Sequence, residues 1–165
     1  MKLLKIIKNN IVYILIMVLI FAVSRCFSIG LATGESMSPT IPSPSILLIN
    51  KLDKDLQRND IVVCKEGGLK TITKRIIGLP GETVEIRDGH IYIDGSSEPL
   101  EDVETKEYMV GNYGPYTVPE GCYFVMGDNR PYSKDSRYVG PVKKSQIFAK
   151  KMLVLLPISD IGVKD

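Results

Sequence analysis

Three short segments of this chain contain the residue types needed for nucleophilic chemistry. The first, 34–40, contains Ser36, and the second contains Lys74 within a mainly apolar run. The third, 127–141, is polar and follows the apolar run 122–126. A serine hydroxyl becomes a useful nucleophile when a nearby base takes its proton, and a lysine can be that base if its pKa falls. A linker, an edge-strand lysine and a surface turn are the ordinary alternatives.

The setting of Lys74 is unusual for a lysine. Successive strand residues point to opposite faces, so Ile72, Lys74 and Ile76 share one face of the predicted strand Leu69–Leu79. Burial on such a face disfavours the ammonium form and lowers the lysine pKa. A base that works near neutrality needs a decrease of roughly 3 units, which corresponds to about 4 kcal/mol. We therefore expect Lys74 to be partly buried.

The polar segment 127–141 mixes acidic, basic, amide and hydroxyl side chains. Because it directly follows a predicted strand, its first side chains begin at the edge of the core. This placement predicts a hydrogen-bonded network around a site. The residues concerned are Asp128, Asn129, Arg130, Ser133, Asp135, Ser136 and Arg137.

The elements that must position these segments are mostly strands. Apolar runs of strand length alternate with turn residues, and Asp88-Gly89 is a strong hairpin signal. We expect a mostly β fold, with antiparallel sheets forming a compact catalytic domain over 30–165 and a small excursion from the core sheet at about 96–120. A short helical turn is expected at Lys143–Ala149. The predicted strands are Ser45–Lys51, Asp60–Lys65, Leu69–Leu79, Thr83–Arg87, His90–Asp94, Cys122–Met126 and Ala149–Leu156.

The N-terminal segment predicts a membrane anchor. Lysines at positions 2, 5 and 8 precede an unbroken apolar run over 11–23. A cleaved signal peptide is the competing interpretation, but Arg25 would directly follow the best cleavage site. We expect a cytoplasmic N-terminus at 1–10 and one transmembrane helix at 11–29, with a possible start at residue 6. The basic N-terminus places the remaining chain on the outer face of the cell membrane.

Charge and cysteine content narrow the classes of function. The chain has 165 residues, with 21 Lys and Arg against 19 Asp and Glu. This balance provides no basis for a nucleic-acid partner, which usually requires a concentrated basic face. The spacing of the cysteines does not match a zinc site. Cys64 and Cys122 fit two buried small residues, and a disulfide between them stays open as an alternative.

Taken together, the three segments resemble type I signal peptidases. The matching stretches are SMSPT at 36–40, KRIIGLPGE at 74–82 and GDNRPYSKDSRYVGPV at 127–142, in the order found in the family. HIYIDG at 90–95 is also similar. The resemblance covers about 36–142 and is preceded by the expected anchor. It implies a membrane-anchored serine endopeptidase that removes signal peptides from exported preproteins.

The resemblance also implies roles for individual residues. Ser36 would be the nucleophile, Lys74 the general base, and Ser133 the residue that orients the lysine. Met37 would help to shape the substrate cleft. Two acidic residues would hold the site together by pairing with arginines: Asp128 and Asp135, with Arg75 and Arg137.

Substrate preference and chemistry follow from the same resemblance. The enzyme would bind an extended preprotein segment and cut after small residues, at sites of the Ala-X-Ala type. It would need no metal or cofactor. Its other partner would be membrane lipid, with the site near the outer membrane face. The chain departs from some family members at Gly34, where they have a serine that helps to stabilise the oxyanion.

Three alternatives remain in view. Some relatives use a Ser–His pair, but His90 lies outside the three catalytic segments. A self-cleaving repressor-type protease would need a DNA-binding domain, for which the first 30 residues leave no room. A non-catalytic anchored relative would be expected to lack Ser36 or Lys74, and both are present.

Overall fold

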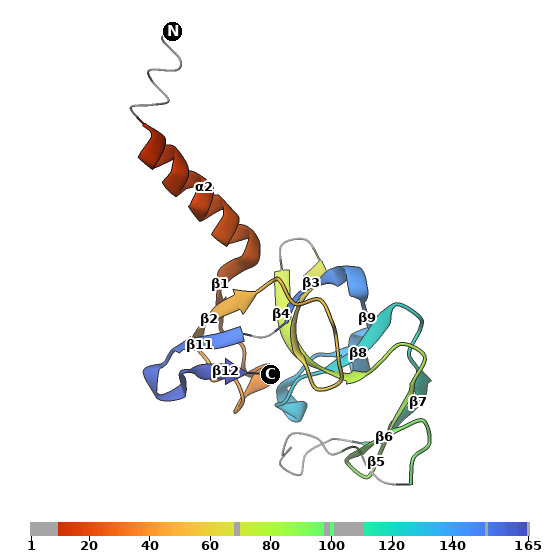
Figure 1. Cartoon of the computed structure of the whole chain (residues 1–165). Helices are drawn as coiled ribbons and strands as arrows, with labels where there is room; N and C mark the ends of the chain where they lie inside the picture. Colours follow the sequence, from red (N-terminus) through yellow and green to blue (C-terminus); the bar gives the residue numbers. More distant parts are fainter. Residues whose placement is uncertain (1–9, 68–69, 98–99, 101–110, 151, 165) are drawn as a thin grey trace.

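The computed structural model describes residues 10–67, 70–97, 100, 111–150 and 152–164. These residues form three antiparallel sheets, and a long helix projects from them (Figure 1). The mostly β, antiparallel fold expected from the sequence is confirmed.

The projecting helix is α2, Ile11–Cys26. Its side chains are apolar almost throughout, and none of them is buried against the rest of the protein. The helix ends at Cys26 because Phe27–Ala32 forms strand β1 and pairs with the second strand. The expected helix to residue 29 is therefore too long by three residues. Within the part of the chain that the structure describes, no helix combines the length and hydropathy required to cross a membrane.

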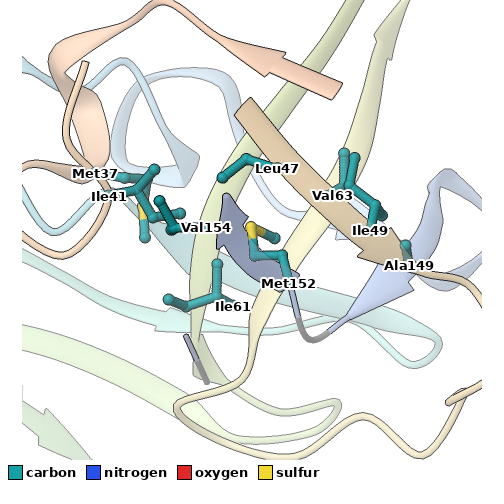
Figure 2. Close-up of a cluster of buried hydrophobic side chains, with 9 residues drawn as sticks. All are labelled: Met37, Ile41, Leu47, Ile49, Ile61, Val63, Ala149, Met152 and Val154. Atoms are coloured by element: carbon teal, nitrogen blue, oxygen red, sulfur yellow. The ribbon is translucent and has the colours of Figure 1, made fainter. Parts of the chain in front are cut away.

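The first sheet contains the order β1-β2-β11-β12, and β1 lies at its edge. Its other strands are β2 (Ser45–Asn50), β11 (Met152–Leu156) and β12 (Gly162–Lys164). Alternate side chains of β2 and β11 point into a hydrophobic cluster (Figure 2). The members of this cluster are Met37, Ile41, Leu47, Ile49, Ile61, Val63, Ala149, Met152 and Val154.

The second sheet has the order β10-β3-β4-β8-β9. Strand β4 pairs with β3 over 70–75 and with β8 only from Arg75 onward, so residues 70–74 have one open edge. This open edge becomes part of the site described below. The strand bounds are β3 Ile61–Gly67, β4 Lys70–Gly78, β8 Cys122–Met126, β9 Val142–Lys143 and β10 Ile147–Lys150.

A third, small sheet has the order β6-β5-β7. Its strands are β5 (Thr83–Arg87), β6 (His90–Ile93) and β7 (Tyr113–Thr117). The expected hairpin is present, with Asp88 and Gly89 both at positive φ in its turn. Strand β7 lies in the expected excursion at 96–120, of which 98–99 and 101–110 fall outside the described residues.

The C-terminal third differs most from expectation. The predicted strand Ala149–Leu156 is divided between β10 and β11, which belong to different sheets. The helical turn expected at Lys143–Ala149 is a 3-10 turn that covers only Lys144–Gln146. The remaining short helices are η1 (Glu35–Met37), η2 (Arg130–Tyr132), α3 (Ser136–Val139) and η4 (Ile158–Asp160).

The cysteines do not pair. Cys64 is buried in an apolar cluster formed by strands of the second sheet. Cys122 packs against a different cluster, which includes residues of the small sheet. Both thiols are free, as is that of Cys26. Of the two alternatives, the structure therefore has separate small residues and no disulfide.

Candidate active site

Ser36 lies in η1, the tight turn that follows β1. The turn is closed by the Ser38 N–H, which donates to the Glu35 carbonyl at 3.1 Å. The adjacent side chain of Met37 is buried in the hydrophobic cluster next to Ile41 (Figure 2). Anchoring on one side and closure of the turn on the other hold the Ser36 hydroxyl in a fixed position.

Lys74 meets this hydroxyl from the second sheet. Its Nζ lies 2.6 Å from Ser36 Oγ, in a hydrogen bond between residues 38 positions apart in sequence. The lysine is only 3% exposed. It pairs with Val62 on β3 and shares its face of β4 with Ile72 and Ile76, which belong to or pack against an apolar cluster. The partial burial expected from the sequence pattern is thus more complete than predicted.

The environment of Lys74 lowers its pKa below the ordinary value for lysine. Burial is the main cause, since the charged ammonium loses its hydration. The negative charges of Asp135 and Glu66 act in the opposite direction, but burial outweighs them. An amine with a lowered pKa, within hydrogen-bonding distance of a serine hydroxyl, can accept the hydroxyl proton.

The other face of β4 contains a buried ion pair. Arg75 donates from Nε and Nη2 to the two carboxylate oxygens of Asp128, both at 2.9 Å. Arg75 also donates to the Asn59 carbonyl at 2.6 Å. This bidentate pair connects β4 with the segment that follows β8. The expected pairing of these two residues is present.

The second expected pair, Arg137 with Asp135, is at the centre of a larger network. Arg137 Nε donates to Asp135 Oδ1 at 2.8 Å, and the Gly127 N–H donates to Oδ2 at 3.0 Å. Ser133 Oγ donates to the same Oδ2 at 2.7 Å. Burial alone would raise the Asp135 pKa, but the hydrogen bonds from Arg137 and Ser133 lower it. Asp135 is therefore an ionised carboxylate that holds Ser133 in place.

The turn Glu35–Met37, which contains the predicted nucleophile Ser36 and is called the nucleophile turn below, is also supported by Asn129 and Gly127. Sequence reasoning assigned no individual role to these two residues or to Arg130, which bonds to Gly127. The Asn129 N–H donates to the Ser36 carbonyl at 3.0 Å, and its side-chain amide donates to the Glu35 carbonyl at 3.0 Å. Arg130 is buried, and its Nε donates to the Gly127 carbonyl at 2.9 Å. Their position directly after an apolar strand was the signal that could have identified them.

Gly127 allows these segments to approach closely. A Cβ atom at this position would lie 2.4 Å from the Ser36 carbonyl oxygen and 2.3 Å from Ser133 Oγ. These distances are too short for any side chain. Glycine is therefore required by the contact between the nucleophile turn and the Asp135 network.

A groove of about 310 Å³ leads to the Ser36–Lys74 pair. One wall is formed by 30–34, which includes the free edge of β1, and the other by 70–74 of β4, whose edge is also open. The base of the groove is apolar and is formed by Met37, Ile41, Leu47, Ile49 and Val63. Two open strand edges with an apolar floor can bind an extended peptide by main-chain hydrogen bonds.

Of two further residues discussed from the sequence, Gly34 lies beside the pair and His90 lies apart from it. Gly34 lines the groove, and a Cβ built on it would meet nothing within 4 Å. His90 is exposed on β6 in the small sheet and pairs in register with Arg87. Among the described residues, no three His, Cys, Asp or Glu side chains gather in a way that could hold a metal ion.

Comparison with known proteins gives consistent matches. A family model described as "Signal peptidase, peptidase S26" matches residues 4–156. The chain is 40% identical over 129 residues to signal peptidase I V of Bacillus subtilis (strain 168), covering 69% of this chain and 77% of that protein. It is 35% identical to signal peptidase I P of Bacillus subtilis subsp. natto over an alignment of 173 residues, gaps included, which covers 93% of this chain and 94% of that protein.

A solved structure is also similar. The crystal structure of a signal peptidase I from Enterococcus faecalis is 38% identical in sequence and superposes with a TM-score of 0.49. The superposition covers 58% of this chain and 96% of the crystallised one.

Proposed function

Because this chain belongs to the signal peptidase family and is a serine endopeptidase, we propose that it uses a Ser36–Lys74 dyad to remove signal peptides from exported preproteins. The observation that carries the proposal is the 2.6 Å contact between Ser36 Oγ and the buried Lys74 Nζ. The preprotein segment before the cut binds in the groove, and cleavage follows small residues in an Ala-X-Ala pattern. No nucleic acid takes part.

The reaction proceeds through an acyl-enzyme. Neutral Lys74 takes the Ser36 proton as Oγ attacks the scissile carbonyl carbon, and the resulting ammonium passes that proton to the leaving amine as the C–N bond breaks. Lys74 then takes a proton from water, whose oxygen attacks the ester carbonyl. Breakage of the ester bond returns the proton to Ser36. Ser133 donates to Asp135, and the negative charge of Asp135 acts on Lys74.

The developing oxyanion faces the backbone amide of Ser36. Gly34 offers no side-chain donor, so a second donor comes from a backbone amide or a bound water. Loss of one such donor in other enzymes costs about 10²–10³ in rate, which makes a substitute donor necessary here.

Two features support preference for an extended substrate with small side chains. The open edges of β1 and β4 can hydrogen-bond to a strand placed between them. Along such a strand alternate side chains point to the groove floor, where Met37 and Leu47 leave shallow apolar space. Residues at the first and third positions before the cut would occupy it, in agreement with an Ala-X-Ala pattern.

We infer membrane anchoring from α2 together with the apolar residues that flank it in the sequence, because α2 by itself is shorter than a span. Its apolar side chains contact no protein core, and Arg25 lies in its last turn, where its side chain can reach the interface. Ser36 follows the end of the helix after one short strand. With the basic N-terminus in the cytoplasm, the site lies on the outer face of the cell membrane, where signal peptides emerge.

The decisive test compares wild type, Ser36→Ala and Lys74→Ala on a peptide with an Ala-X-Ala site, in detergent. We expect wild type to cut after the second Ala, and both variants to be folded and inactive. Lys143→Ala, which removes an exposed lysine, is the matched control and should cut normally. Near-normal cleavage by Lys74→Ala would exclude Lys74 as the base. A folded but inert wild type would favour a non-catalytic role.

A further inference from the structure

A second hollow lies on the outer surface of the segment that supports the nucleophile turn. It is lined by Pro131, Tyr132, Ser133, Lys134 and Tyr138, and it shares no lining residue with the groove. Tyr132 and Tyr138 are 76% and 69% exposed. Exposed aromatic rings are typical of surfaces that bind another chain, because they supply large contact areas at a low entropic cost.

This hollow is close to Ser36. The short helix η2, which contains Tyr132, packs against η1, which contains Ser36. Gly127 lies between them, close enough that a single added carbon would contact both the Ser36 carbonyl oxygen and Ser133 Oγ. Ser133 is also part of the hollow's lining. The hollow and the turn that contains Ser36 thus belong to adjoining, packed segments.

The support behind the hollow is rigid. Arg137 donates from Nη2 to the Arg130 carbonyl at 2.7 Å and lies bidentate against the buried Asp135. Ser136 is buried, and its Oγ accepts from the Val125 N–H at 2.9 Å. The exposed rings are thus carried on a backbone fixed from below. Such pre-organisation lowers the entropic cost of binding.

We propose that this hollow is a subsite for the first residues of the mature protein, which follow the scissile bond. The inference rests on the proposed function, since it describes the other half of the same substrate. The groove contains the signal-peptide side of the cut, so the mature side has to continue past Ser36. Tyr132 and Tyr138 would contact its side chains and backbone.

Lys134 gives this subsite a charge preference. It is exposed, and it lines the hollow beside the two rings. An acidic residue at the second or third position after the cut would be attracted to its ammonium, and a basic residue would be repelled. Because the contact is exposed, the expected preference is about threefold in kcat/KM.

The test uses two peptides with the same Ala-X-Ala half. The short peptide has one residue after the cut, and the long one has six, including an aspartate. For wild type we expect a higher kcat/KM with the long peptide. Tyr132→Ala and Tyr138→Ala should each lower the long-to-short ratio about five- to tenfold. Tyr92→Ala, which removes a ring that packs under Arg87 in the small sheet, is the control and should leave the ratio unchanged.

A further pair of measurements addresses charge. Replacing the aspartate of the long peptide by lysine should lower kcat/KM for wild type, and Lys134→Gln should remove this difference. Melting temperatures of all variants should match that of wild type, because the altered side chains are exposed.

Several results would overturn the inference. One is a wild-type enzyme that cuts both peptides equally well. Another is a ratio that Tyr132→Ala and Tyr138→Ala leave unchanged. If these variants instead weaken binding to vesicles of phosphatidylglycerol and phosphatidylethanolamine, the hollow is a lipid contact and not a peptide subsite. A wild type that cuts neither peptide would overturn the proposed function itself, and this inference with it.

Discussion

At the residue scale, Lys74 is a basic side chain placed where its charged form cannot be fully hydrated. A lysine that is only 3% exposed destabilises its own charge, and in the proposed mechanism that penalty makes its neutral form available as a base. The same residue would be an ordinary strand lysine if its neighbours were hydrated. Its reactivity is therefore a property of the apolar face on which it lies.

The first prediction concerns the pH dependence of cleavage. Only neutral Lys74 can take the Ser36 proton. At pH values below the lowered pKa of Lys74 the side chain is an ammonium and kcat/KM should be low, and kcat/KM should rise as the pH increases through that pKa. Glu66 raises this pKa through its negative charge. Glu66→Gln should therefore move the rising limb to lower pH.

The matched control for this shift is Glu85→Gln, on the small sheet. The rising limb of its kcat/KM against pH should coincide with that of wild type. A rising limb in Glu66→Gln that stays in place, or moves to higher pH, would contradict the assignment of Lys74 as the titrating base.

The second prediction concerns Gly127→Ala. The added methyl group would overlap the Ser36 carbonyl oxygen and Ser133 Oγ, so the nucleophile turn has to shift. A displacement of about 1 Å can cost on the order of 10²-fold in rate, and we expect a loss of kcat of that size. Gly162→Ala, whose Cβ would meet nothing within 4 Å, should retain full activity in the same peptide assay. Normal kcat in Gly127→Ala would show that the turn is not held by this contact.

At the scale of elements, the Arg75–Asp128 pair connects β4 with the start of the polar segment 127–141, which follows β8. Both side chains are nearly inaccessible to solvent. A buried pair contributes less to stability than its geometry suggests, because both ions lose hydration, but removal of one partner leaves an uncompensated charge.

The third prediction follows from this asymmetry. Asp128→Ala should lower the free energy of unfolding by about 3–5 kcal/mol, because Arg75 remains buried without its carboxylate. The double variant Arg75→Met with Asp128→Leu should regain much of that loss. Urea denaturation monitored by circular dichroism measures both. A double variant less stable than Asp128→Ala would show that the ion pair is itself strongly stabilising.

The sequence predicts some elements much better than others. Strand β4 was predictable because it is rich in β-branched residues and is followed by the Pro80-Gly81 turn, and the hairpin of β5 and β6 because Asp88-Gly89 specifies its turn. The division of 149–156 between β10 and β11 was not predictable, since the whole run is apolar and the change of sheet depends on tertiary pairing. Strand β1 was hidden for a similar reason, because its first residues continue the apolar run of the helix.

The same distinction applies to the site. Ser36, Lys74 and the polar segment could be identified from residue types and their resemblance to a family. The groove could not, because its walls are edges of two different sheets whose separation depends on packing. Local sequence specifies which side chains are present, whereas the space between them depends on contacts far apart in the chain.

At the scale of the whole molecule, α2 and the β domain are largely independent. No side chain of α2 is buried, and its link to the domain includes a hydrogen bond from Lys51 Nζ to the Ser24 carbonyl at 2.6 Å. The hydrophobic clusters are formed entirely by residues that follow the helix. The β domain should therefore fold without the helix.

The fourth prediction tests this independence. A chain that begins at Phe27 should unfold cooperatively and cut a short Ala-X-Ala peptide at a rate close to that of the full chain. It should lose binding to phosphatidylglycerol vesicles in a flotation assay, because the exposed apolar helix is absent. Full vesicle binding by the shortened chain would place the membrane contact in the β domain. Loss of cooperative unfolding would show that α2 contributes to the core.

The open edges of β1 and β4 have a consequence for product release. In the proposed mechanism, the peptide fragment that leaves the enzyme last is the one in the groove, and it retains every main-chain contact that the uncut segment had. The cleaved signal peptide should therefore compete with fresh substrate and slow turnover as it accumulates. The apolar part of the cleaved signal peptide would allow it to partition into the lipid beside α2. Partitioning into the bilayer would then remove the cleaved signal peptide from the groove and limit product inhibition.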